Sequence, residues 1–420
     1  MPSLNGKPVQ VANKSQSATQ QDATQTRSQL PSPKMIDPPK ESNIFPRVKP
    51  LWEGPSGEGV NGGITFSLLS RFIVCRERFK VKVIEGLGPI DGFNHRIEYG
   101  NMWHLCEEEL ATFGEPKWTS PTSKDAFFSR LTTYTESLCK RYRLSQDDIV
   151  HWMKVCKLQF EEYSLHWAKN SSLFSSNINH HLMAEDVFDF GYRLPSGRLV
   201  RLRGKRDGVF LSEDDDGLNL FIQENKTKSE LDQLTIQRQL RFDMQTMIYL
   251  IVMHYDPSTK RVISELIANH SCESVRKRAI NPSLSVLYNG VRRPLSGGKH
   301  SIRQHKGETY SAFLLRLKGL IQEDPGYFFM RWIIGVSLQD LARFKLLCLD
   351  PILEELCDWW EMMIGMKKEY PARHWIHPYG IYNPMDDGGF SEVDEYIMTG
   401  STSGLTRITN LFPELTPIEM

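Results

Sequence analysis

The chain has 420 residues, of which 40% are hydrophobic and 24% are charged, and its 51 basic residues balance 51 acidic ones. This is the composition of a soluble globular protein, and no apolar run reaches the roughly 20 residues of a membrane span. No secretory signal is visible at the N-terminus, and seven cysteines without a Cys-x-x-Cys pair indicate reduced thiols. We therefore expect a cytoplasmic protein with no membrane partner.

The predicted elements begin after a polar segment. Residues 1–62 are rich in Ser, Gln, Thr and Pro, and we expect them to form a disordered arm. Beyond them, Ser67 is the expected N-cap of the first helix, and Tyr327–Trp332 is a candidate added strand. The predicted helices span residues 66–85, 95–113, 122–142, 145–170, 232–253 and 338–369, and the predicted strands lie within 183–226 and near 262–268 and 284–291. Strands surrounded by helices predict a mixed α/β sheet.

Charged residues end two neighbouring strands of the central group. In Leu218–Ser229 an alternating apolar row runs into Glu224 and Lys226. In Gly197–Ser212 the same alternation places Asp207 after a row of basic side chains, which are Arg201, Arg203 and Lys205. The polar, glycine-ended segment between the strands suits a hairpin. The hairpin is expected to bring Asp207, Glu224 and Lys226 together at one end of a sheet.

The residue types at this end of the sheet predict metal chemistry. Two carboxylates forced together repel each other unless a cation lies between them, and a few oxygen ligands with room for water suit Mg²⁺. A nearby lysine can orient or deprotonate a water molecule, or balance phosphate charge. A metal that polarises a phosphoryl oxygen and activates water cleaves phosphodiesters. The alternative interpretation is a set of surface salt bridges of little energetic value, with Glu224 paired to Lys226.

Two helical segments carry further polar residues. Each segment places three of them on one face, at a spacing of four residues. They are Gly100, His104 and Glu108 in Ile97–Gly114, and Arg241, Gln245 and Tyr249 in Leu234–Tyr255. Taken alone, a histidine on a helix is usually structural, and a glutamine one turn from a tyrosine is usually an exposed or half-buried pair.

Taken in this order, the segments resemble the PD-(D/E)xK nuclease superfamily, and within it the branch of the RecB and AddB nuclease domains. The motifs are Gly-x-x-x-His, a strand pair that opens with Glu185 and ends in Asp207, Glu-x-Lys, and Gln-x-x-x-Tyr, and they cover residues 67–255. The resemblance implies a restriction-endonuclease-like core, a central mixed β-sheet flanked by helices, over residues 63–270. Residues 271–420 would then form a helical C-terminal extension packed on that core.

The resemblance also implies roles for particular residues. Asp207, Glu224 and Lys226 would be catalytic. The metal, Mg²⁺ or Mn²⁺, would be held by His104, Asp207, Glu224 and the backbone carbonyl of Asn225. Gln245, Tyr249 and Arg241 would bind substrate.

The implied function is a metal-dependent DNA nuclease, an exonuclease or end-processing enzyme in DNA recombination or repair, in a phage or bacterial setting. Its partners would be DNA and a helicase or recombination protein, because the sequence contains no P-loop of its own. Two alternatives stay open at this point. One is a non-catalytic module that binds DNA ends or a partner, and the other is a restriction-type endonuclease.

The sequence departs from the branch at the cysteines. Several relatives bind an iron–sulfur cluster through one early and three late cysteines, and here only Cys75 has a matching place. Cys348 and Cys357 lie in an apolar helical stretch and are expected in the core. An iron–sulfur cluster is therefore not expected, and Cys75 is predicted to be a buried thiol. The loop after residue 291 could contact phosphates through Arg292, Arg293, Lys299, Arg303 and Lys306, or be a solvated loop.

Overall fold

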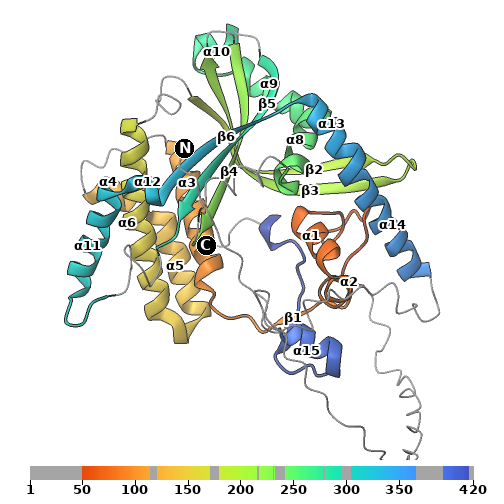
Figure 1. The fold of residues 1–420 in the computed structure, drawn as a ribbon, viewed down its shortest axis with the longest axis horizontal. Helices are drawn as coiled ribbons and strands as arrows, with labels where there is room; N and C mark the ends of the chain where they lie inside the picture. Colours follow the sequence, from red (N-terminus) through yellow and green to blue (C-terminus); the bar gives the residue numbers. More distant parts are fainter. Residues whose placement is uncertain are drawn as a thin grey trace, which may run out of the picture. The chain divides into compact units, whose positions relative to one another are not determined.

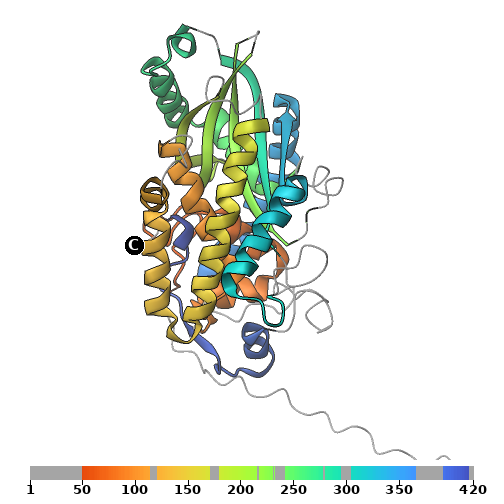
Figure 2. The ribbon, with the colours of Figure 1, turned by 90° about the vertical axis from the view of Figure 1, so that its left-hand side faces the viewer.

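A five-stranded sheet lies at the centre of the protein, with helices on both faces (Figures 1 and 2). The computed structural model describes residues 50–113, 121–170, 179–214, 217–229, 231, 242–277, 280–294, 304–365 and 391–415. These residues belong to one compact unit. No helix within the described ranges is long and apolar enough to cross a membrane.

The sheet mixes parallel and antiparallel pairing. Its strands, in spatial order, are β2 (Asn179–Arg193), β3 (Leu199–Asp214), β4 (Gly217–Lys228), β5 (Ile280–Arg292) and β6 (Phe329–Val336). Only β4 and β5 pair in parallel, and the other neighbours are antiparallel. The predicted mixed sheet flanked by helices is therefore confirmed. A separate two-stranded ladder joins β1 (Leu87–Pro89) to β7 (Leu405–Arg407).

The strands β3 and β4 separate partway along their length. They pair from the turn at Asp214 and Gly217 as far as Gly208 and Gln223, and no further. Beyond that point β3 stays paired to β2, while β4 continues beside β5 to Lys228. The sheet therefore forks immediately after Gly208 and Gln223, and Figure 1 shows the two arms diverging. Asp207 and Glu224 are the first residue of each arm.

Two groups of helices cover the two faces of the sheet. One group consists of α3 (His95–Phe113), α4 (Pro121–Phe127), α5 (Ser129–Arg141), α6 (Gln146–Asn170), α11 (Tyr310–Glu323) and α12 (Pro325–Phe328). The other consists of α1 (Phe66–Val74), α2 (Arg76–Phe79), α8 (Met244–Tyr255), α9 (Pro257–Ala268), α10 (Glu273–Lys277), α13 (Leu338–Phe344) and α14 (Asp350–Gly365). A further helix, α15 (Glu392–Thr399), packs beside β1 and α2. Short π-helical turns at Lys80–Ile84 and Lys345–Leu349 continue α2 and join α13 to α14.

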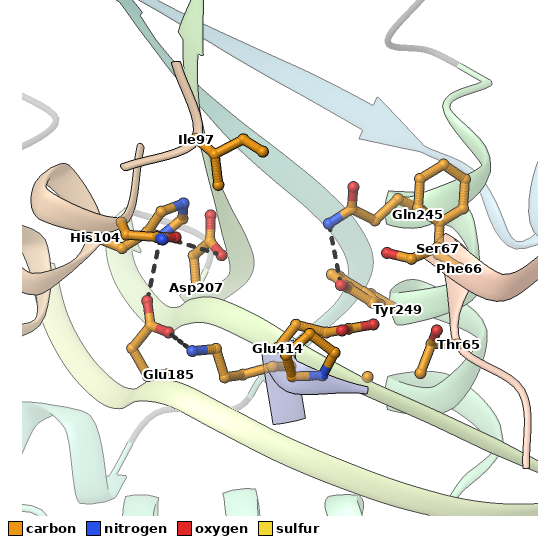
Figure 3. A pocket seen from close by; sticks show the side chains of 14 residues that line it. Thr65, Phe66, Ser67, Ile97, His104, Glu185, Asp207, Gln245, Tyr249 and Glu414 are labelled. Carbon is orange, nitrogen blue, oxygen red and sulfur yellow. Dashed lines mark hydrogen bonds and ion pairs between the residues drawn. The ribbon is translucent and has the colours of Figure 1, made fainter. Parts of the chain in front are cut away.

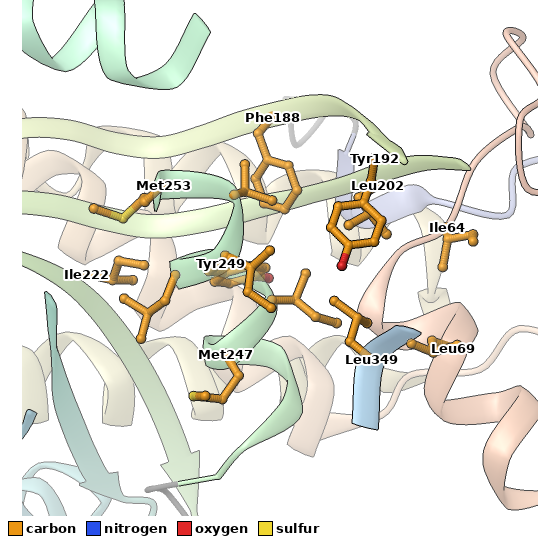
Figure 4. Close-up of a cluster of buried hydrophobic side chains, with 14 of the residues drawn as sticks. Ile64, Leu69, Phe188, Tyr192, Leu202, Ile222, Met247, Tyr249, Met253 and Leu349 are labelled. Atoms are coloured by element: carbon orange, nitrogen blue, oxygen red, sulfur yellow. The ribbon is translucent and has the colours of Figure 1, made fainter. Parts of the chain in front are cut away.

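Each helical group encloses its own apolar cluster. On the α8 side, Tyr249 and Met247 pack against Phe188 and Leu202 of the β2–β3 arm and against Leu349 near α14 (Figure 4). On the other side, Trp103, Phe160 and Phe313 join α3, α6 and α11 into a second buried cluster. Since β4 and β5 are covered on both faces, consecutive residues such as Phe221 and Ile222 of β4 are both buried.

The segment before residue 63 differs from its prediction. Residues 50–62 were predicted as part of the disordered arm, yet Trp52 is 1% exposed and donates a 2.8 Å hydrogen bond from Nε1 to the Gly63 carbonyl. Its ring also meets Phe79 edge to face. The buried aromatic ring docks this polar stretch together with Arg201 and Arg203, which donate hydrogen bonds to its backbone carbonyls. Residues 1–49 lie outside the described residues.

Two local predictions are wrong, and capping explains both. The predicted strand at 262–268 is part of helix α9, because Asp256 accepts hydrogen bonds from the Ser258 and Thr259 amides and Pro257 occupies the first turn. The first helix is capped by Thr65, which accepts from the Leu68 amide at 3.2 Å, and Ser67 lies inside it. The strand predicted at 284–291 is confirmed as part of β5. The strand predicted at 327–332 is confirmed from Phe329 onward in β6, whereas Tyr327 and Phe328 end helix α12. In the helix predicted at 232–253, residues 232–241 lie outside the described residues.

One buried ion pair fastens α15 to the rest of the protein, and it yields the first prediction. Arg78 donates to Asp394 from Nε at 2.5 Å and from Nη2 at 2.6 Å, and Asp394 is fully buried. Burial alone would raise the pKa of Asp394, but the hydrogen bonds from Arg78 and Ser391 outweigh it and hold the pKa below its ordinary value. The stabilisation is therefore present above the ordinary aspartate pKa and is lost as the pH falls through the lower folded value.

We expect Asp394→Ala to reduce the free energy of unfolding by about 2 kcal/mol at pH 7, because Arg78 loses its partner at a half-buried site. The difference from wild type should shrink at pH 3. Urea unfolding at the two pH values measures it, with the exposed Glu395→Ala on the same helix as the control. A difference that is equal at both pH values would contradict the electrostatic explanation.

Candidate active site

A cavity of about 470 Å³ lies beside the fork (Figure 3). It is enclosed by the first turn of α1, by α3, by β2 and β3, by α8, and by the short C-terminal helix Pro413–Leu415. Among its lining residues are His104, Glu185, Asp207, Gln245 and Tyr249. The sequence analysis predicted metal or substrate roles for four of these five residues. It named Glu185 only as the start of a strand pair.

Three ligand-type side chains converge on one side of the cavity. His104 of α3, Glu185 of β2 and Asp207 of β3 each offer an atom within 4.8 Å of the other two. His104 Nδ1 lies 3.3 Å from Glu185 Oε1 and 3.6 Å from Asp207 Oδ1 (Figure 3). One imidazole and two carboxylates at this spacing form a donor set suited to a divalent cation.

Glu185 adopts an unusual backbone conformation at this place. Its φ is 48°, a left-handed value, and no other non-glycine residue in the described ranges has a positive φ. It lies opposite Asp207, between the paired residues Ala184↔Gly208 and Asp186↔Arg206. Backbone strain of this kind costs of order 1–3 kcal/mol and persists only where surrounding contacts hold it. Those contacts are His104 and an ion pair from Lys205 Nζ to Glu185 Oε2.

Glu224 and Lys226 lie on the β4 arm of the fork. Glu224 is 1% exposed, and its Oε1 is paired with Lys226 Nζ. Lys226 also donates to Gln245 Oε1 at 2.9 Å, and Gln245 donates to the Tyr249 hydroxyl at 3.0 Å. The second oxygen, Glu224 Oε2, is buried and has no hydrogen-bond partner among the described residues. A buried anionic oxygen without a partner is costly, so this side chain also fits a cation.

The two arms are joined at the fork by one backbone hydrogen bond. The Asn225 amide donates to Asp207 Oδ2 at 2.6 Å, which leaves Oδ1 of the same carboxylate facing His104. Helix α3 approaches β4 closely one turn before His104. A Cβ atom at Gly100 would lie 3.4 Å from Thr227 Oγ1. That distance is an ordinary van der Waals contact, so α3 packs directly on β4 at the glycine of the Gly-x-x-x-His motif.

The carboxylates dominate the electrostatics of the cavity. Burial opposes a charge on His104, but Asp207, Glu185 and Glu224 outweigh burial and raise the pKa of His104 to about 9. Burial, with Asp207 nearby, raises the pKa of Glu224 to about 7 despite the opposing charge of Lys226. Burial also raises the pKa of Asp207. Without a metal, the three carboxylates are balanced by the positive charges of His104, Lys205 and Lys226.

The cluster of possible metal ligands differs in one residue from the set expected from the sequence. The residue that joins His104 and Asp207 within ligand distance is Glu185, while Glu224 faces them from the other arm. The signal for Glu185 was present in the sequence. Antiparallel pairing about the turn at 195–197 places residue 185 opposite residue 207. Arg241 lies outside the described residues.

The basic loop and the cysteines also have defined environments. Arg292 donates to the backbone carbonyls of Tyr327 and Leu231, and Arg293 is buried, so neither is available to phosphates as their prediction required. Lys306 is exposed, whereas Lys299 and Arg303 lie outside the described residues.

Cys75 is buried, as predicted, and its sulfur accepts a hydrogen bond from the Arg78 amide. The apolar stretch with Cys348 and Cys357 packs into the core, as predicted.

A forked mixed sheet with a His–Glu–Asp cluster and a Glu-x-Lys strand defines the class of nucleases that need a divalent metal. A comparison with protein families matches the PD-(D/E)XK nuclease superfamily over residues 64–308, which is more than half of the chain. The chain therefore belongs to the PD-(D/E)XK nuclease superfamily. A comparison with curated proteins finds no match. The likeness to the RecB and AddB branch stays a prediction.

The donor set predicts that a divalent cation stabilises the folded protein. Mn²⁺ at 100 times its dissociation constant would add about 2.7 kcal/mol to the free energy of unfolding. We expect the thermal midpoint to rise with MnCl₂ and to fall back with EDTA. Asp207→Asn should abolish the rise, because the cation loses a charged ligand that faces His104.

Differential scanning fluorimetry measures this response, with Asp125→Asn, an exposed acid on α4, as the control. If Asp207→Asn shows the same metal-induced rise as Asp125→Asn, the cluster is not the metal site.

Proposed function

We propose that the protein is a DNA nuclease that hydrolyses phosphodiester bonds with the help of Mg²⁺ or Mn²⁺. Membership of the PD-(D/E)XK superfamily supports the nuclease class. The observation that carries the proposal is the meeting of the His104–Glu185–Asp207 cluster with the Glu224–Lys226 strand at the fork of the sheet. This combination supplies ligands for a metal and, on the neighbouring β4 arm, a cation for phosphate.

We assign the metal ligands to His104, Asp207, Glu224 and the Asn225 carbonyl, with Glu185 added from the geometry. When bound, the metal polarises a phosphoryl oxygen and makes its bound water more acidic. Asp207 is already oriented by the Asn225 amide, and His104 by Glu185. The side chains therefore need little rearrangement to accept the ion.

Lys226 is proposed to position the attacking water and to balance charge on the phosphate. Burial would lower the pKa of Lys226, but the Glu224 carboxylate outweighs it and raises the pKa. The ammonium group is thus held protonated, so it acts as a donor rather than as a base. Gln245 accepts from Lys226 and donates to Tyr249, which holds the lysine toward the cavity. Gln245 and Tyr249 line that cavity and are the proposed substrate contacts.

The biological role follows from the likeness of the motifs to RecB and AddB. We propose end-directed cleavage in DNA recombination or repair, in the cytoplasm of a bacterial or phage-infected cell, with a helicase or recombination protein as partner. The intact Glu224–Lys226 pair argues against a module that only binds DNA. The order of the motifs argues against a restriction-type endonuclease.

Lys226→Ala is expected to lower the cleavage rate at least 100-fold, because the positioned cation at the phosphate is lost. The test incubates full-length protein with 5′- and 3′-labelled linear single- and double-stranded DNA and with a closed circle, in Mg²⁺, Mn²⁺ or EDTA. The exposed Lys260→Ala on α9 is the matched control. The label pattern reports polarity, and cutting of the circle reports endonuclease action.

Equal cutting by wild type and Lys226→Ala would refute the catalytic assignment. Metal-independent cutting would refute the mechanism. DNA binding without cleavage in any metal would favour the binding module instead.

A further inference from the structure

A second group of polar side chains is buried on the face of β4 opposite the cavity. Its members are Glu107 of α3, Gln223 and Asn225 of β4, and Asn289 of β5. Their exposed fractions are 7%, 6%, 4% and 0%. Burying a carboxylate and three amides is unfavourable unless their hydrogen bonds are made. The group therefore needs a reason beyond filling space, which apolar side chains of similar size would do without that cost.

The four side chains form a closed ring of hydrogen bonds. Gln223 Nε2 donates to Glu107 Oε2 at 3.2 Å and to Asn225 Oδ1 at 3.0 Å. Asn289 Nδ2 donates to Glu107 Oε1 at 2.9 Å and to Asn225 Oδ1 at 2.8 Å. The two amides thus bridge the Glu107 carboxylate to the Asn225 side chain. Among the described residues Asn225 Nδ2 has no partner, but the other hydrogen bonds connect all four side chains. Buried hydrogen bonds of this kind rigidify the elements that contribute to them.

Neighbouring helices and strands anchor the ring. Trp103 Nε1 donates to Glu107 Oε1 at 3.2 Å, and Arg331 Nε of β6 donates to Asn289 Oδ1 at 3.1 Å. Arg331 also donates to the Tyr163 hydroxyl of α6 at 2.6 Å. The ring therefore ties α3, α6, β4, β5 and β6 together at one level of the sheet.

The ring reaches the metal site at two points. The side chain of Asn225 belongs to the ring, while its amide donates to Asp207 Oδ2 on the other face. Glu107 lies three residues after His104 on the same helix, so the ring also fixes α3 against β4. Two parts of the proposed metal site, the Asn225 peptide and His104, thus depend on one set of buried hydrogen bonds.

We propose that Glu107, Gln223 and Asn289 are positioning residues that hold the Asn225 peptide and His104 in the geometry that binds the metal. The inference rests on the proposed function, because it assigns these residues to the same metal site. They do not touch substrate or metal. Their effect passes through the backbone of β4 and through helix α3. Outer partners of metal ligands commonly change metal affinity 10- to 100-fold when they are removed.

The test measures metal binding and backbone protection rather than activity. Isothermal titration of full-length protein with Mn²⁺, without DNA, should give at least a 10-fold weaker affinity for Asn289→Leu than for wild type. Leucine keeps the volume but removes the hydrogen bonds from Asn289 Nδ2 to Glu107, Asn225 and the Tyr163 hydroxyl. Hydrogen exchange of the metal-free protein should be at least 10-fold faster in the peptide 221–228, because the Asn225 amide is no longer held.

Exchanging the carboxylate and the amide between positions 107 and 289 distinguishes a positioning role from a loss of stability. Asn289→Asp places a second carboxylate against Glu107 and should weaken Mn²⁺ binding. The double variant Glu107→Gln/Asn289→Asp keeps one carboxylate and reverses the direction of the hydrogen bond between the two positions. It should recover most of the lost affinity, and that recovery is a coupling between the two sites.

Leu317→Ala is the control for destabilisation alone. Leu317 is fully buried on α11 in the apolar cluster of Trp103 and Phe160, and it makes no contact with the ring that the structure records. Its loss should lower the thermal midpoint and leave the Mn²⁺ affinity and the exchange of peptide 221–228 unchanged. A parallel loss of affinity in Leu317→Ala would show that the effect is general destabilisation and would overturn the inference.

The outcomes distinguish this inference from the proposed function. If wild type binds no Mn²⁺, the proposed metal site falls and the inference falls with it. If wild type binds Mn²⁺ and Asn289→Leu binds it equally well, the positioning role is overturned while the nuclease proposal stands.

Discussion

The separation of β3 from β4 is the constraint on which the site depends. A continuous antiparallel pair would place Asp207 directly opposite Glu224, with their backbone groups used in pairing. Because the pairing stops at Gly208 and Gln223, the Asn225 amide is free to hydrogen-bond the Asp207 carboxylate. That single bond closes the fork and aims the other oxygen at His104. The cavity and the ligand cluster follow from this divergence.

The fork concentrates buried charges of both signs, carried by carboxylates, a histidine and lysines. Burial raises the pKa values of Asp207 and Glu224, and one Glu224 oxygen has no hydrogen-bond partner among the described residues. Glu185 adds a strained backbone at the same place. Such features reduce stability, and they persist where the surroundings hold them in place. Here the surroundings are two apolar clusters, one on each face of the sheet, and the ring of hydrogen bonds around Asn225.

The fold class was readable from the sequence because long periodic segments identify their own type. The helices from 95 to 170, the central strand group and the mixed sheet all follow from patterns of apolar residues. Errors arose where a few side chains override local composition. Asp256 and Pro257 begin a helix where β-branched residues suggested a strand, and Trp52 docks a segment whose neighbours are polar. Neither effect is visible in an average over a window of residues.

For the site, the sequence by itself determined the residue types, their order and the strand ends on which they lie. Alternation along a strand is local, so Asp207, Glu224 and Lys226 could be expected together, and the resemblance to the nuclease superfamily added His104. Only the tertiary structure decided which carboxylate faces which. Glu185 joins His104 and Asp207 because a hairpin register and a left-handed backbone bring it there. The ring of hydrogen bonds joins Glu107 to Asn289, which lie far apart in the sequence. Contacts between residues so distant in the sequence come from packing rather than from any local pattern.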